Sequence, residues 1–298
     1  MKGRFTAELG TSEAERLIGE IGSLKPGFLS VTGGEPLLRD DIFHLLEYAG
    51  GMMNVGLVTN GTLIDGEVAA RLSRLDVYVS LSFDAATKET CELIRGKGAW
   101  GKAMAAARAL KENSVPFNPV MTITSLNAHE AGAFVNLSAD LESVNASLIP
   151  LIPSGSADMK LMPSQSSLAS AIGSVEEVAE ERGFPVSLWC TPFARALVSS
   201  PYVHPGGCSE LSMDVDPLGN VLLCDVLDFK LGNVLEDGGK QAWKKMMNNS
   251  LYKEFRDASK LTGKCKECAL KPTCKGGCKA RAYLTHNSFS TPDPLCPL

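Results

Sequence analysis

The sequence predicts an α/β protein in which a parallel sheet, wrapped by helices, is followed by a small cysteine-rich domain. Two observations predict this class. Apolar segments of strand length alternate with amphipathic helical segments over the first two thirds of the chain, and seven of the nine cysteines lie in its last third. Alternating strands and helices are typical of parallel sheets with right-handed crossovers.

Six strands and six helices are expected in alternation. The first helix is predicted to begin after Ser12, because Glu15 follows at the spacing of a capping box, and Asp40 or Asp41 is expected to cap the second. The expected strands are 27–31, 55–59, 76–82, 117–124, 146–152 and 184–190. The expected helices are 13–21, 42–48, 65–75, 101–113, 128–141 and 166–183. The segments 153–170 and 199–207 are rich in Pro, Gly and Ser, and we expect them to be loops that connect parts of the chain. The second segment marks the expected boundary between domains 1–198 and 199–298.

Polar residues and glycines occur where the predicted strands end. They are Gly33 to Glu35, Asn60, Ser82, Asp84, Thr124, Asn127 and Ser154. Taken one at a time, each is explained by a turn or a helix cap. The carboxyl ends of parallel strands meet at one edge, where ligands bind in α/β sheets and barrels, so the set together predicts a binding site.

The first of these turns, residues 32–36, has the chemistry of an ammonium-binding site. Gly33 and Gly34 let the backbone approach a ligand closely, and Glu35 places a carboxylate beside backbone carbonyls. Pro36 stiffens the exit into the following helix. The tetrapeptide alone is also consistent with a simple strand-to-helix turn.

The cysteines form the strongest pattern in the chain. Five follow the order C-x2-C-x5-C-x3-C and a final C, and two lie upstream in a C-x15-C segment with an internal G-x4-C. They are Cys265, Cys268, Cys274, Cys278, Cys296, Cys208 and Cys224. Cysteines that serve only as apolar core residues have no reason to recur at such intervals. Gly276 and Gly277 let the backbone fold tightly around a bound group. The other two cysteines, Cys91 and Cys190, have no cysteine partners at such spacings in the sequence.

Three kinds of bonding can explain these cysteines. Disulfides are disfavoured because the sequence opens with no signal peptide, so we expect the protein in the cytoplasm. The cytoplasm is a reducing compartment that keeps thiols free. Zinc is commonly held by C-x2-C pairs, and iron–sulfur clusters also take cysteine ligands from scattered positions. The cysteine pattern by itself favours clusters and leaves zinc open.

Composition argues against two classes of partner. The chain has 298 residues, a net charge of −5 and a pI near 5.5, which argue against a nucleic-acid-binding surface. No run of the sequence reaches the ~18 apolar residues that a membrane span needs.

Several segments together resemble the radical S-adenosylmethionine superfamily. They are TGGEPLL at 32–38, TNG at 59–61, SFDA at 82–85 and IRGKGAW at 94–100. The cysteine frame from Cys208 to Cys296 resembles the SPASM extension of that superfamily. The resemblance implies a partial (β/α)6 barrel, here lacking its first strand, followed by a SPASM domain. It also implies S-adenosylmethionine and up to two auxiliary [4Fe-4S] clusters as cofactors.

The resemblance also assigns site residues. The turn that binds the methionine amine matches Gly33, Gly34, Glu35 and Pro36, and the surrounding cavity matches Asn60, Ser82, Asp84 and Arg95. Arg95 suits the methionine carboxylate, and is otherwise a solvated loop residue. One cluster is expected on Cys265, Cys268, Cys274 and Cys296, and the other on Cys208, Cys224 and Cys278. The second cluster then has three thiolate ligands. Asp214 or Asp216 supplies the fourth ligand as an oxygen, or the fourth iron has no protein ligand. If neither aspartate is a ligand, both belong to a turn before Gly219.

The C-x3-C-x2-C motif, which in the superfamily binds the cluster that reduces S-adenosylmethionine, is absent from this sequence. In relatives it lies just upstream of a segment like residues 3–18. We therefore expect that the first strand and its cysteine loop are missing at the N-terminus, and that the chain as written does not cleave S-adenosylmethionine. An in-frame triplet encoded upstream of Met1 would restore the enzyme.

The tail, including residues 232–234 and 243–257, resembles the branch that modifies tetrapyrroles in the alternative heme and heme d1 routes. The expected function is an iron–sulfur oxidoreductase that modifies a tetrapyrrole side chain through a 5′-deoxyadenosyl radical, with ferredoxin or flavodoxin as electron donor. Lys279, Arg281 and Tyr283 then meet the propionates, or else form a solvated face. Peptide-maturing SPASM enzymes share the cysteine frame, and a non-catalytic iron–sulfur scaffold is a further alternative.

Overall fold

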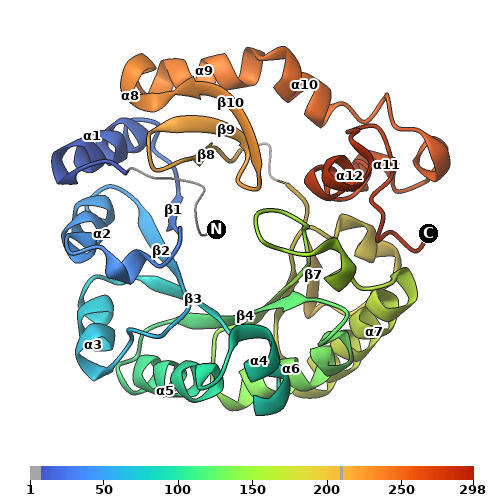
Figure 1. Ribbon diagram of the computed structural model, residues 1–298, viewed down its shortest axis with the longest axis horizontal. Helices are drawn as coiled ribbons and strands as arrows, with labels where there is room; N and C mark the ends of the chain where they lie inside the picture. The colour runs from blue at the N-terminus through green and yellow to red at the C-terminus, as the bar shows by residue number, and fades with distance from the viewer. Residues whose placement is uncertain (1–7, 209–210) are drawn as a thin grey trace.

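The computed structural model describes residues 8–208 and 211–298, which form a curved parallel sheet with helices outside it and a smaller C-terminal part (Figure 1). Seven parallel strands follow one another across the sheet in chain order. They are β1 (Phe28–Val31), β2 (Asn54–Thr59), β3 (Tyr78–Ser82), β4 (Phe117–Ile123), β5 (Ala146–Pro150), β6 (Val186–Leu188) and β7 (Val203–Pro205). The predicted fold class, a partial β/α barrel, is confirmed. Residues 1–7, where the sequence predicts the junction with a missing first strand, lie outside the described residues.

Helices cover the outer side of the sheet, as Figure 1 shows. They are α1 (Thr11–Gly22), α2 (Ile42–Gly50), α3 (Gly66–Arg74), α4 (Lys88–Arg95), α5 (Ala99–Glu112), α6 (Ala131–Asp140) and α7 (Gln165–Arg182). Short 3-10 turns lie between them: η1 (Pro36–Leu38), η2 (Ala128–Glu130), η3 (Met159–Leu161) and η4 (Pro192–Ala196). The six predicted strands and six predicted helices agree with these elements, with residues 128–130 forming η2 instead of the first turn of α6.

The structure differs from the sequence prediction at three places. The N-cap of α1 is Gly10 instead of Ser12, and the Gly10 N–H donates to Glu13 Oε2 over 3.3 Å. Helix α4, which begins after the N-cap Thr87, was not predicted because its eight residues are mostly polar. The stretch at 199–207, predicted as a junction, contains β7, which pairs in parallel with β6.

The two faces of the sheet differ in polarity. On β3, Val79 and Leu81 are fully buried in the core that includes the outer helices. On the opposite face of the sheet, Ser80 Oγ donates to Asn118 Oδ1 (2.9 Å) and Asn118 Nδ2 donates to Ser147 Oγ (2.8 Å). Successive side chains of a strand point to opposite faces, so the outward residues form the core while the inward residues form a polar lining.

The C-terminal part contains a three-stranded antiparallel sheet and five helices. The strands are β8 (Asp214–Val215), β9 (Asn220–Cys224) and β10 (Leu227–Asn233). The helices are α8 (Val234–Asp237), α9 (Gly239–Asn248), α10 (Ser250–Arg256), α11 (Lys271–Cys274) and α12 (Lys279–His286), with the 3-10 turn η5 (Gly263–Cys265) before α11. Among the described residues, no helix has the length and apolarity needed to cross a membrane.

Helix α9 packs closely against α1 and joins the C-terminal part to the barrel (Figure 1). The Gly239 N–H donates to Glu20 Oε2 over 2.8 Å. A Cβ at position 239 would lie only 2.1 Å from the Glu20 carbonyl oxygen. This contact therefore requires a residue without a side chain, because backbone atoms on both sides cannot move apart without opening the interface.

We expect Gly239→Ala to lower the free energy of unfolding by about 1–3 kcal/mol, the usual cost of overpacking a close contact. Gly101→Ala is the matched control, because a Cβ at this exposed helical position meets nothing within 4 Å. The control should raise stability by about 0.5–1 kcal/mol through helix propensity. Urea unfolding of both variants measures the difference, and equal effects would show that α1 and α9 are not in close contact.

Candidate functional site

Glu35 joins the turn after β1 to the end of β2. Its Oε1 accepts hydrogen bonds from Thr59 Oγ1 (2.7 Å) and the Leu37 N–H (3.2 Å), and its Oε2 accepts one from the Asn60 N–H (2.8 Å). The carboxylate is therefore bound within the protein on both oxygens. Glu35 therefore holds the turn in shape.

Gly33 and Gly34 lie in this turn with open space beside them. A Cβ at either position would meet no atom within 4 Å, and neither residue has a positive φ angle. Neither backbone conformation nor packing of the described residues therefore requires glycine here. The backbone of both glycines is therefore open to approach at the carboxyl edge of the sheet.

Asp84 and Arg95 form an ion pair at the end of β3. Arg95 Nε and Nη2 lie 2.8 and 2.7 Å from Asp84 Oδ2, and Asp84 Oδ1 accepts the Thr122 N–H over 2.6 Å. Arg95 is thus fixed by a carboxylate and is not a freely solvated loop residue. Ser82, the last residue of β3, is half-buried beside this pair.

The remaining polar residues of the rim have structural roles. Asn127 is fully buried, and its Oδ1 accepts hydrogen bonds from the Thr124 N–H and Oγ1. The Ser154 N–H donates to the Ile152 carbonyl within a turn. Glu130, which the sequence did not single out, accepts hydrogen bonds from the Ala86 and Thr87 N–H groups and shapes the loop before α4. For these residues the turn interpretation is correct.

Four cysteines line one cavity of about 120 Å³ between the barrel and the C-terminal part. Three of them, Cys208, Cys224 and Cys278, were grouped from the sequence. The fourth is Cys190, which follows β6 and has no cysteine nearby in the sequence, so sequence spacing did not group it with the others. Interaction of the neighbouring Cys190 and Cys278 thiols raises the pKa of Cys190 and lowers that of Cys278.

The donor set of this cavity fits an iron–sulfur cluster. Four thiols face a space enclosed by protein, where iron cations supply the positive charge that keeps thiols ionised. Asp214 also lines the cavity, and burial, with the nearby Asp225, raises the pKa of Asp214 to about 6. Asp216 instead accepts hydrogen bonds from the Leu218 and Asn220 N–H groups, so its role is the turn. Within the described ranges, no three His, Cys, Asp or Glu side chains are arranged to hold a single metal ion.

The second set of cysteines lies in the tail. Cys265 and Cys296 are buried, and Cys268 and Cys274 are partly exposed. Burial raises the pKa of Cys265, and the Cys296 and Cys268 thiols raise it further. Burial likewise raises the pKa of Cys274 to about 11, with Cys296 and Cys265 adding to the effect. This set also fits a cluster with four thiolate ligands.

Two glycines bring the cysteine loops together. Gly276 and Gly277 have φ angles of +90° and +81°, in the left-handed region. A Cβ on Gly277 would lie 2.4 Å from Cβ of Asp293. The tight fold that the sequence predicts at Gly276 and Gly277 is therefore present, and it places Cys274 and Cys278 on the two sides of a sharp turn.

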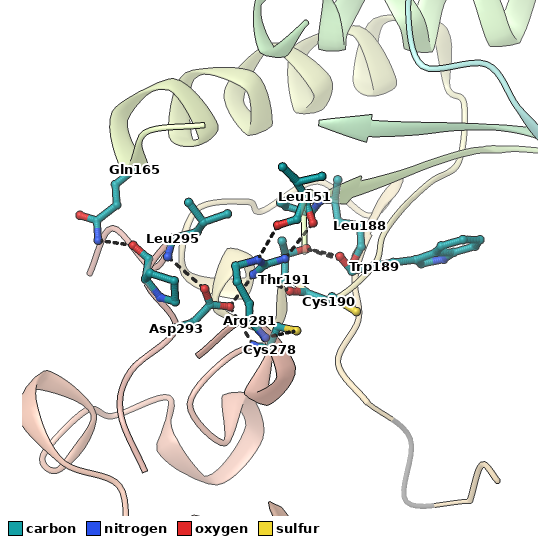
Figure 2. A network of polar contacts seen from close by, with 12 residues as sticks. Leu151, Gln165, Leu188, Trp189, Cys190, Thr191, Cys278, Arg281, Asp293 and Leu295 are labelled. Atoms are coloured by element: carbon teal, nitrogen blue, oxygen red, sulfur yellow. Dashed lines mark hydrogen bonds and ion pairs between the residues drawn. The ribbon is translucent and has the colours of Figure 1, made fainter. Parts of the chain in front are cut away.

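A fully buried ion pair connects the tail to the barrel (Figure 2). Arg281 Nη1 lies 2.6 Å from Asp293 Oδ2. The guanidinium also donates to the carbonyl oxygens of Leu151 (3.1 Å), Pro150 (3.0 Å) and Cys190 (3.5 Å). Asp293 accepts the Cys278 N–H over 2.8 Å. The pair therefore holds the backbone of both Cys190 and Cys278, as Figure 2 shows.

The predicted contacts of Lys279 and Arg281 with propionates conflict with their burial, and so does the solvated alternative. Lys279 is buried, and its Nζ donates to the Phe289 carbonyl over 2.7 Å. Arg281 has no exposed surface. Both stabilise the C-terminal part from inside. Tyr283 is partly exposed and stacks on Phe289 with ring centroids 4.6 Å apart.

Two family models match the chain. The Radical SAM superfamily model matches residues 3–137, and the SPASM model, an iron–sulfur cluster-binding domain, matches residues 208–269. Mycofactocin maturase MftC of Mycobacterium ulcerans is 30% identical over 98% of this chain and 81% of its own. AdoMet-dependent heme synthase of Methanosarcina barkeri is 28% identical over 97% of this chain and 87% of its own. PqqA peptide cyclase of Granulibacter bethesdensis is 26% identical over 99% and 80%.

Solved structures share the fold. The structure of anSMEcpe with bound AdoMet has a TM-score of 0.77 at 22% identity, covering 99% of this chain and 87% of that one. Streptococcus suis SuiB bound to the precursor peptide SuiA has a TM-score of 0.75 at 16% identity, covering 100% and 72%.

We expect Asp293→Ala to lower the free energy of unfolding by about 3–5 kcal/mol, because it leaves the Arg281 charge buried without its partner. The control is Asp140→Ala, which removes the exposed Arg182–Asp140 pair and should cost less than about 1 kcal/mol. Chemical denaturation of the apoprotein measures both. Similar small losses in the two variants would contradict a buried, compensated pair.

Proposed function

Because the chain belongs to the radical S-adenosylmethionine superfamily and carries a SPASM iron–sulfur domain, we propose that it is an oxidoreductase whose C-terminal part holds two auxiliary [4Fe-4S] clusters. The observation that carries this proposal is the cavity lined by Cys190, Cys208, Cys224 and Cys278. Membership of this family implies [4Fe-4S] clusters and S-adenosylmethionine as cofactors. The division into a barrel domain, residues 1–198, and a SPASM domain, residues 199–298, is part of the proposal.

The proposed ligands of the two clusters differ in origin. The tail cluster takes Cys265, Cys268, Cys274 and Cys296, all within one short segment. The other takes Cys208, Cys224 and Cys278 with Cys190 as fourth ligand, in place of the aspartate or open iron expected from the sequence. Cys190 is favoured because it lines the same cavity as Cys278, whereas Asp216 is bound in a turn.

The proposed S-adenosylmethionine site is the carboxyl edge of β1 to β3. Backbone carbonyls of Gly33 and Gly34 accept the methionine ammonium, and Glu35 and Pro36 fix the turn around it. Asn60 and Ser82 line the same edge. Arg95, held by Asp84 through Nε and Nη2, offers its third nitrogen, Nη1, to the methionine carboxylate. In this superfamily the cofactor supplies a radical that abstracts hydrogen from the substrate, and the protein orients it and excludes water. Because the given sequence lacks the C-x3-C-x2-C motif, we propose that this chain as written binds the cofactor without cleaving it.

As substrate we propose a tetrapyrrole whose side chain is modified. The support is the match with the Methanosarcina barkeri heme synthase over 97% of this chain, together with the tail segments that resemble that branch. A peptide substrate is the second candidate, because MftC and PqqA peptide cyclase match the chain over similar lengths. An electron donor such as ferredoxin or flavodoxin completes the proposal.

Binding separates the two substrate classes. The anaerobically reconstituted chain is titrated with a propionate-bearing porphyrin, and separately with peptides that end in the C-terminal residues of maturase precursors. Porphyrin fluorescence and calorimetry give the affinities. Saturable micromolar porphyrin binding without peptide binding supports the tetrapyrrole proposal, and the reverse result contradicts it.

Removing Cys190 tests the fourth ligand. Cys190→Ala should lower the iron and sulfide content from about eight of each per chain toward four, or leave a cluster that loses iron easily, since one thiolate is missing. Cys91→Ala is the matched control, because Cys91 lies buried in the barrel on α4 with its thiol against the Phe83 carbonyl. Iron and labile sulfide assays after anaerobic reconstitution measure the effect. An unchanged content and spectrum in Cys190→Ala would assign the fourth position elsewhere, and zinc in place of iron would overturn the cluster proposal.

Gly34→Ala tests the cofactor turn. We expect thermal stability to stay the same or rise slightly, because a Cβ meets no neighbour and reduces the freedom of the unfolded chain. Affinity for S-adenosylhomocysteine should fall about tenfold, equal to ~1.4 kcal/mol, because the Cβ occupies the ligand's side of the backbone. Calorimetry and thermal unfolding give the two values. Unchanged affinity would contradict the placement of the ligand at this turn.

A further inference from the structure

Arg256, the last residue of α10, lies between the two sets of cysteines. It lines the cavity of about 120 Å³ next to Cys208. It also lines a second cavity, of about 50 Å³, whose wall contains both Cys208 and Cys274 of the tail set. One arginine therefore borders both cysteine sets, and Cys208 lies beside it in both cavities.

Two aromatic rings of the same helix hold the guanidinium of Arg256. Its Cζ lies 5.2 Å from the ring centroid of Tyr252 and 5.8 Å from that of Phe255. Both rings are buried in the core of the C-terminal part. A guanidinium over aromatic faces is stabilised by the ring electrons. The packing of α10 therefore sets the position of Arg256.

Arg256 binds the backbone of Cys208. Arg256 Nη1 donates to the Cys208 carbonyl oxygen over 3.0 Å. Cys208 lies between β7 and β8, directly after Gly206 and Gly207. Glycines leave the backbone more freedom than other residues do, so the hydrogen bond restrains a segment whose own sequence does not. The contact uses the carbonyl of Cys208 and leaves its sulfur available as a ligand.

The same arrangement occurs at Cys190. Its carbonyl oxygen accepts a hydrogen bond from Arg281 Nη1 over 3.5 Å. Cys190 follows β6 and Cys208 follows β7, so both come from the ends of the last two strands of the parallel sheet. Arg281 lies on α12 and Arg256 on α10, both in the C-terminal part. Each arginine therefore connects one of these cysteines to the part of the chain that carries the other cysteines of the cavity.

We propose that Arg256 is a positioning residue for the cluster on Cys190, Cys208, Cys224 and Cys278, and that it fixes Cys208 as Arg281 fixes Cys190. This inference rests on the proposed function, since it requires a cluster on this set. Groups that orient a metal ligand without touching the metal commonly change metal retention 10- to 100-fold. Without the hydrogen bond, Cys208 can move away from the other three sulfurs, and the iron that it holds is lost more easily.

The test is the rate of iron release from the anaerobically reconstituted chain to an iron chelator. The phase that belongs to this cluster is the one missing in Cys190→Ala. In Arg256→Met, which keeps the apolar stem of the side chain, we expect this phase to become at least tenfold faster. Arg256→Lys keeps a positively charged donor and should restore most of the slow rate. Lys253→Met is the matched control, because Lys253 is an exposed cation on the same helix, and its release rates should equal those of the wild type.

Other outcomes would overturn the inference. Unchanged release in Arg256→Met, or the same acceleration in Lys253→Met, would show that the contact with Cys208 does not hold the cluster. Equal acceleration of the tail-set phase, with lower stability of the apoprotein, would mean that Arg256 stabilises the C-terminal part as a whole. Weaker porphyrin binding with unchanged iron release would assign Arg256 to the substrate. A wild-type chain without iron and sulfide would instead refute the proposed function itself, so the two failures are distinguishable.

Discussion

The structure of the C-terminal part depends on the ion pair between Arg281 and Asp293. A lone guanidinium without exposed surface would cost several kcal/mol in lost hydration, so its burial requires acceptors on every side. The structure supplies them from three separate segments: the end of β5, the loop after β6 and Asp293 itself. Because Asp293 in turn accepts the Cys278 N–H, the pair fixes two cysteines that are 88 positions apart in the sequence.

At the carboxyl edge of the sheet, charged side chains are likewise hydrogen-bonded to backbone groups. Glu35, Asp84 and Glu130 each accept hydrogen bonds from backbone N–H groups of neighbouring segments. Carboxylates that are already hydrogen-bonded hold the backbone around them in one arrangement, which is the preorganisation that a binding site requires. These carboxylates therefore shape the edge of the sheet.

Substrate choice is separate from this shared framework. Relatives named as heme synthases and as peptide maturases match the chain over nearly all of its length, and a fold supports many activities through local changes. Lys279 and Arg281 are packed inside the C-terminal part, where they stabilise the fold. These two side chains therefore do not account for a choice between the proposed substrates.

The alternation of strands and helices, the polar residues at the strand ends and the clustering of seven cysteines can be predicted from the amino-acid sequence. These follow from local patterns, namely apolar periodicity, glycine turns and short cysteine spacing, which act over a few residues. That Cys190 lies in the same cavity as Cys278 emerges only from the folded chain, because packing brings the loop after β6 next to the start of α12 and no local spacing records that contact. The burial of Arg281 also depends on the folded chain. A charged side chain is expected at the surface from its sequence, and the acceptors that allow Arg281 to be buried come from distant segments.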